Sequence, residues 1–132
     1  MASIRANSVS LRIFGDDLDP EGVSALLGGS PSWAHSKGDA LDGDALPAAT
    51  GAWVLESALS ETAEIEDHVA ELFGKLTSDQ DEWSTLTNQF AVDVRCELEA
   101  GDEGEGFDLS PRLAAALAER GVVISFSLLG PS

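Results

Sequence analysis

The sequence predicts an α+β domain in which helices pack on one face of a mostly antiparallel sheet. Apolar residues alternate with polar ones over 8–14 and 90–99, which indicates half-buried strands. An apolar stripe with helical spacing runs through 61–76. The predicted order begins β-α-β-β-α-β, which matches a two-layer, ferredoxin-like layout, and it ends in a C-terminal strand-helix-strand extension.

Two stretches, 15–28 and 107–121, carry the same helix-boundary signals. Each has a residue that can cap the helix, a proline at the first helical position and a glycine after the last. These residues are Asp19, Pro20 and Gly28 in the first copy, and Ser110, Pro111 and Gly121 in the second. We expect Asp19 and Ser110 each to accept a hydrogen bond from an N–H group of the first turn. A helix is predicted over 20–27 and another after Ser110.

The remaining elements follow from composition and spacing. Strands are predicted over 32–39, which ends in a turn, and over 52–57, 90–99 and 122–129; helices are predicted over 61–76 and about 78–88. The strand at 90–99 directs Cys96 into the core. Residues 40–51 are expected to form an exposed loop, and 100–106 an acidic, glycine-rich turn. The chain is predicted to be one domain, 1–132, with flexible ends at about 1–7 and 130–132.

Charge separates this chain from most proteins of its size. It has 24 acidic and 7 basic residues and a net charge of −17. Such a surface repels phosphate, so binding to nucleic acid or to an anionic membrane is not expected. One cysteine excludes an internal disulfide, and the sequence shows no signal peptide and no apolar run long enough for a membrane span. A soluble cytoplasmic protein is expected.

The acidic residues have three interpretations. Most of the charge is expected to serve solubility, including adaptation to high salt. Alternatively, the loops at 39–44 and 102–105 and the helix face at 61–71 form a surface for a basic partner protein. The third interpretation, a metal site, is disfavoured because no acidic run has the calcium-loop spacing and the two histidines and one cysteine are far apart. No cofactor is expected.

One strand end could bind a small ligand. Trp33, His35 and Lys37 alternate, so we expect them on one face of a strand, beside Asp39 and Trp53. An aromatic ring, an imidazole and an ammonium group on one face suit an anionic or aromatic ligand. His68 lies at the edge of the long helix's apolar stripe and is expected to be a packed side chain rather than a catalytic one.

Several short motifs, in this order and spacing, resemble the bacterial domain of unknown function numbered 4279. They are 15–20 after the first strand, Leu27-Gly28 with Pro31, Lys37-Gly38-Asp39, 51–55, His68 with Leu72, and Leu109-Ser110. The resemblance covers nearly the whole chain and implies a compact α+β domain without a known activity. The acidic insert at 41–44 departs from the pattern, where basic residues would be expected more often.

The function favoured by the sequence is therefore binding rather than catalysis. We expect an acidic protein–protein interaction domain, of the immunity type or another inhibitory type, with a basic partner. The alternatives are a small-ligand or weakly catalytic site at the strand end, and acidity that reflects salt adaptation alone. The candidate binding residues are Trp33, His35, Lys37, Asp39, Asp42, Asp44, Trp53, Glu103 and Glu105.

Overall fold

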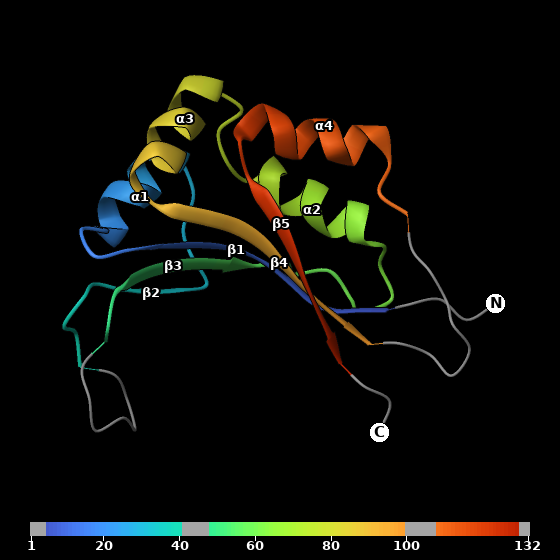
Figure 1. The fold of residues 1–132 in the computed structure, drawn as a ribbon, viewed down its shortest axis with the longest axis horizontal. Coiled ribbons are helices and arrows are strands. Elements are labelled where there is room, and N and C mark those ends of the chain that lie inside the picture. Colours follow the sequence, from blue (N-terminus) through green and yellow to red (C-terminus); the bar gives the residue numbers. More distant parts are fainter. Residues whose placement is uncertain (1–4, 41–47, 100–107, 130–132) are drawn as a thin grey trace.

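The computed structural model describes residues 5–40, 48–99 and 108–129, which form five strands and four helices. In chain order these are β1 (Arg5–Gly15), α1 (Pro20–Leu27), β2 (Trp33–His35), β3 (Gly51–Glu56), α2 (Ile65–Gly74), α3 (Gln80–Gln89), β4 (Ala91–Glu99), α4 (Pro111–Arg120) and β5 (Val123–Leu129). The four helices cover one face of the sheet, and the other face, which we call the outer face, carries no helix (Figure 1). The α+β class is confirmed.

The sheet is mixed, with strand order β2-β3-β1-β4-β5. The β1 strand is antiparallel to both β3 and β4, and β2 is antiparallel to β3. The last pair, β4 and β5, is parallel, and α4 makes the crossover that a parallel connection requires. The C-terminal strand-helix-strand unit is thus present, whereas the ferredoxin-like layout is not confirmed.

The core lies between the sheet and the helices. Val9, Leu11 and Ile13 of β1 are buried against it, and so is Cys96 of β4, as the alternation predicts. Two buried tryptophans bring their polar atoms to nearby partners. Trp53 Nε1 donates to Ser24 Oγ at 3.0 Å. Trp83 Nε1 donates to the Thr77 carbonyl oxygen at 2.8 Å.

The helix-boundary predictions hold at five of the six positions, since α1 begins at Pro20 and α4 at Pro111. Gly28 and Gly121 are left-handed, with φ of 74° and 69°. Ser110 Oγ accepts a hydrogen bond from the Leu113 N–H at 3.1 Å. The prediction for Asp19 is wrong, because its side chain makes no capping hydrogen bond. The Val23 N–H instead donates to the Asp19 carbonyl oxygen at 3.0 Å, so the backbone alone begins this helix.

The long helix is shorter than the apolar stripe suggests, since it begins at Ile65 and ends at Gly74. Ser60 explains its late start. Its carbonyl oxygen accepts from the Ala63 N–H at 2.9 Å, and its hydroxyl accepts from the Thr62 N–H at 3.0 Å. A serine that bonds nearby backbone groups stabilises a turn at the expense of the helix. Glu64 consequently lies outside α2, in an extended conformation.

Candidate functional site

The sheet brings together two of the side chains predicted to bind a ligand. Trp33 and His35 project from β2 on the outer face, and their rings stack with centroids 5.7 Å apart. Trp33 is 46% exposed, so it is not a core residue. Beside them on the same face, the Arg12 guanidinium lies 5.1 Å from the centroid of the Phe14 ring. This end of the outer face therefore presents aromatic surface to solvent.

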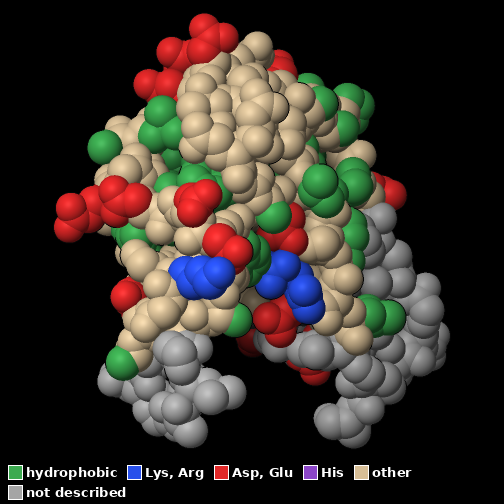
Figure 2. All heavy atoms as spheres, turned by 60° about the vertical axis from the view of Figure 1, so that its left-hand side comes forward, with side chains coloured by type: hydrophobic (Ala, Val, Ile, Leu, Met, Phe, Trp, Pro, Cys, Tyr) green, Lys and Arg blue, Asp and Glu red, His purple; other side chains and the backbone are tan. Residues whose placement is uncertain are grey.

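Lys37 and Asp39 follow Trp33 and His35 closely in the sequence, but their side chains bind other residues. Lys37 lies in the turn after β2, and its Nζ forms an ion pair with Asp16 Oδ2 at 3.3 Å. Asp39 Oδ2 accepts a hydrogen bond from the Ser36 N–H at 2.8 Å. Figure 2 looks from the side of α1 and β2, and the Lys and Arg side chains seen there lie beside acidic ones. These charges stabilise the turn rather than face the Trp33–His35 stack.

Trp53 does not join the stack. Its cross-strand neighbour on β2 is Ala34, whereas Trp33 lies opposite Val54 and His35 opposite Ala52. Successive residues of a strand face opposite sides, so Trp53 points toward the helices and is fully buried. The other candidate binding residues, Asp42, Asp44, Glu103 and Glu105, lie outside the described residues.

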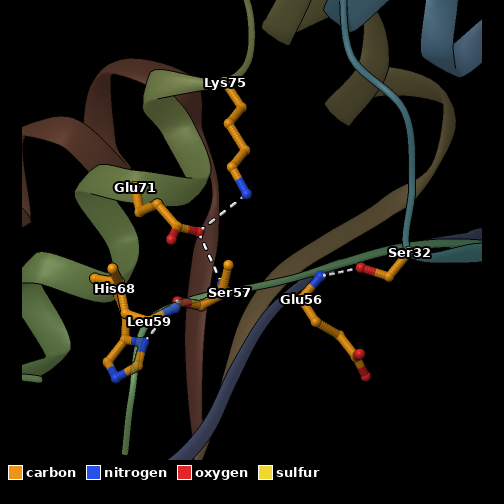
Figure 3. A network of polar contacts seen from close by, with 8 residues as sticks. Ser32, Glu56, Ser57, Leu59, His68, Glu71 and Lys75 are labelled. Atoms are coloured by element: carbon orange, nitrogen blue, oxygen red, sulfur yellow. Dashed lines mark hydrogen bonds and ion pairs between the residues drawn. The ribbon is translucent and has the colours of Figure 1, made fainter. Parts of the chain in front are cut away.

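The structure also contains a polar network that the sequence pattern does not predict, at the junction of β3 and α2 (Figure 3). Ser57 Oγ lies 2.7 Å from His68 Nδ1 and also accepts from the Leu59 N–H at 3.2 Å. Glu71 Oε1 accepts from the Ala58 N–H at 2.9 Å and pairs with Lys75 Nζ at 3.2 Å. These side-chain and backbone groups fix the segment after β3 against α2.

Burial governs the electrostatics of His68, which is only 2% exposed. Loss of water around the ring lowers its pKa, although the charges of Glu71 and Asp67 and the backbone of Ala63 and Ser60 oppose this. Among the described residues, no group completes a hydrogen bond of regular geometry with the buried His68 Nε2. The Ala58 N–H, together with Lys75, lowers the pKa of Glu71.

A serine hydroxyl bonded to an imidazole is the core of a nucleophilic dyad, so the Ser57–His68 pair is a candidate for catalysis. Such a dyad needs a third group that orients the histidine. His68 Nε2, however, has no hydrogen-bond partner within the described chain, and the Glu71 carboxylate is bound to Ala58 and Lys75. The arrangement therefore favours a structural role, in which a neutral imidazole holds the turn.

Two other potentially reactive or charged groups are also unsuited to catalysis. Burial raises the pKa of the Cys96 thiol to about 12, so it remains protonated at neutral pH. Arg12 Nη2 pairs with Asp93 Oδ2 at 2.7 Å, and Ser125 Oγ donates to the same oxygen at 2.9 Å.

No cluster of three or more metal-ligating side chains occurs among the described residues. Within the same part of the chain, no helix is long and apolar enough to cross a membrane.

Comparison with known proteins decides the family. A family model described as a domain of unknown function, DUF4279, matches residues 4–130. The chain belongs to the DUF4279 family. No curated protein and no solved structure matches this sequence.

One end of the DUF4279 domain carries acidic side chains around the first turns of α2 and α4. The Ser110 hydroxyl donates to Glu66 Oε1, which joins the start of α4 to the start of α2. Glu64, Asp67 and Asp108 are exposed around this junction. We call these three residues and Glu66 the acidic end. It lies toward the opposite end of the domain from β2 (Figure 1).

Proposed function

We propose that this DUF4279 domain is a non-enzymatic interaction module that binds a basic partner protein, in the manner of an immunity-type or other inhibitory protein. The observation that carries the proposal is the charge excess. Even if every Lys and Arg paired with one acid, 17 acidic residues would remain. An uncompensated surface of one sign accelerates association with a partner of the opposite sign.

The acidic end is the described part of the surface that suits this role best. Glu64 and Asp67 are exposed and make no hydrogen bond or ion pair within the described residues through their carboxylates. Asp108 is exposed just before Ser110, whose hydroxyl donates to Glu66 and so ties the start of α4 to α2. A rigid junction presents its charges without first having to order them, which favours binding.

The proposal places the domain in the bacterial cytoplasm and gives it no cofactor. The single cysteine is free and buried, which is compatible with a reducing compartment. Catalysis is the less favoured function class, because the Ser57–His68 pair has no orienting third group among the described residues and the Cys96 thiol is protonated. Neither group is required in the proposed mode of binding.

The test begins with a tagged domain that captures proteins from a lysate of its own host, at low and at high salt. The captured basic protein is then purified, and its association rate is measured with the wild-type domain and two variants. The first variant is Glu64→Gln, Asp67→Asn and Asp108→Asn. The matched control is Asp17→Asn, Glu21→Gln and Glu119→Gln, which removes the same charge from exposed positions elsewhere.

We expect the first variant to slow association about tenfold at low salt, and the control variant to slow it much less. Equal rates for the two variants would remove the acidic end from the interface. A corresponding variant at Asp42, Asp44, Glu103 and Glu105 tests the loops outside the described residues. If no basic protein is retained and the melting temperature climbs steeply up to molar KCl, salt adaptation replaces the proposal.

A second candidate function is small-ligand binding at the Trp33–His35 stack. The observation that favours it is the exposed Trp33 ring stacked on His35, since exposed aromatic rings bind flat or cationic ligands by stacking. Tryptophan fluorescence across a metabolite panel tests this function, with His35→Ala as a comparison. Because Trp53 and Trp83 are buried, Trp33→Phe identifies the part of the signal that comes from the site. A panel without any fluorescence change would rule against it.

A further inference from the structure

A groove of ≈ 480 Å³ is lined mainly by residues of α2 and α4. Its apolar lining includes Val69 and Phe73 of α2 and Leu113 and Ala116 of α4. The volume falls within the range of sites for small organic molecules. The groove is separate from the Trp33–His35 stack and from the Ser57–His68 network, none of whose residues line it.

Two arginines line this groove in a chain that has few cations. Arg112 and Arg120 lie eight residues apart on α4, which places them on one stripe of the helix with a separation of about 12 Å along its axis. Neither forms an ion pair with any described residue. By contrast, Arg12, Lys37 and Lys75 each have an acidic partner.

Arg120 is held in a defined position with donors to spare. Its guanidinium lies 4.3 Å from the centroid of the Phe73 ring and 5.8 Å from that of Trp83. One nitrogen, Nη1, donates to the Ala116 carbonyl oxygen at 3.0 Å. The buried Nε makes no hydrogen bond within the described structure. The remaining N–H groups of this positively charged guanidinium can donate to a carboxylate.

We propose that this groove binds an amphipathic organic anion, whose carboxylate lies against Arg120 and whose unbranched apolar chain covers Ala70 and Ala116 toward Arg112. The apolar lining selects the chain, and the arginine at one end selects the head group. Ser78, which also lines the groove, adds a hydroxyl as a second hydrogen-bonding group. The groove shares Glu66 with the acidic end, but this proposal does not rest on the proposed binding of a basic protein.

One carboxylate in the lining opposes an anion and determines which way it lies. Glu66 also lines the groove, but it accepts a hydrogen bond from Ser110 and lies at the first turn of α2. The carboxylate therefore belongs at the Arg120 end, away from Glu66. The wider acidic surface repels anions at long range, although physiological salt screens charges beyond about 8 Å. Short-range pairing with Arg120 is screened less.

Octanoate and 1-octanol are suitable probes, since they share a chain and differ in charge. Their binding to the full-length chain is measured by titration calorimetry and by amide NMR shifts. We expect octanoate to shift the signals of Val69, Phe73 and Ala116, and 1-octanol to bind at least about tenfold more weakly. Arg120→Gln should weaken octanoate binding by about tenfold or more, while the control Lys37→Gln leaves it unchanged.

Arg120 also packs on two aromatic rings, so replacing it removes this contact as well as the charge. A second variant is therefore needed that leaves the contact in place. Ala116→Phe fills the groove without removing a charge, and it should abolish octanoate binding. Equal binding of both probes, or octanoate binding that survives Ala116→Phe, would overturn the proposal. Shifts centred on residues outside the groove would do the same, because they would show that octanoate binds elsewhere.

Discussion

His68 should make the stability of this domain depend on pH in a direction fixed by its burial. Desolvation lowers its pKa in the folded state below the ordinary value of 6.5. As the pH falls through 6.5, the unfolded chain gains a proton that the folded chain resists, so stability is lost. The slope is at most about 1.4 kcal/mol per pH unit for this one proton. The stabilisation is fully present above pH 6.5.

Urea unfolding between pH 8 and pH 5, followed by tryptophan fluorescence, measures this effect against His68→Asn. An asparagine can still accept the Ser57 hydroxyl hydrogen, but it does not titrate. Protonation of the many carboxylates changes stability in both proteins, so the difference between the two pH profiles isolates His68. In the control variant His35→Asn, His68 is still present, so the loss of stability at low pH should remain. Parallel profiles for wild type and His68→Asn would refute the reasoning.

Three further predictions concern packing, reactivity and association. Leu117→Asp places a carboxylate at a site only 6% exposed, which should cost at least about 3 kcal/mol and unfold much of the domain; an unchanged circular-dichroism melt would contradict this. Because the Cys96 thiol is fully buried with a pKa raised to about 12, a disulfide reagent should react at least about a hundredfold faster in denaturant. Rapid labelling of the folded protein would show that the strand opens. The edge strand β5 exposes 64% of Leu128, so the domain should self-associate in high salt, where charge repulsion is screened, and Leu128→Lys should prevent this while Leu109→Lys does not. Light scattering measures this association.

Local elements are predictable from the sequence because their signals are local. The alternation in β4 and the proline and glycine that bound α1 each act within a few residues, and they indicate nearly the observed bounds. The order of strands depends on pairing between distant segments. Nothing in the sequence of β1 indicates that both its neighbours are antiparallel, or that α4 returns the chain parallel to β4. The order and direction of the strands depend on how α4 packs against the sheet, and the periodicity of the sequence does not specify this packing.

In the candidate sites too, the sequence predicts local features but not contacts that depend on long-range pairing. Alternation predicts that Trp33 and His35 share one face, and their rings do stack in the structure. The sequence also predicts Trp53 beside them, but the register that pairs it with Ala34 turns it into the core. Ser57 and His68 are 11 residues apart and meet only because the segment after β3 folds back on α2. A polar residue at the edge of an apolar stripe is the available signal for His68.

The response to salt separates the two binding proposals. A basic partner held by the acidic end gains much of its association rate from unpaired, exposed charges, so added salt should slow association strongly. An anion in the α2–α4 groove is repelled by the same distant charges. It is attracted by the nearby Arg120 guanidinium, and its chain contacts the apolar lining. Screening removes more of the repulsion than of the attraction, and salt also strengthens apolar burial. Moderate salt should therefore weaken the first interaction and leave the second unchanged or stronger, which a single titration series on one protein can establish.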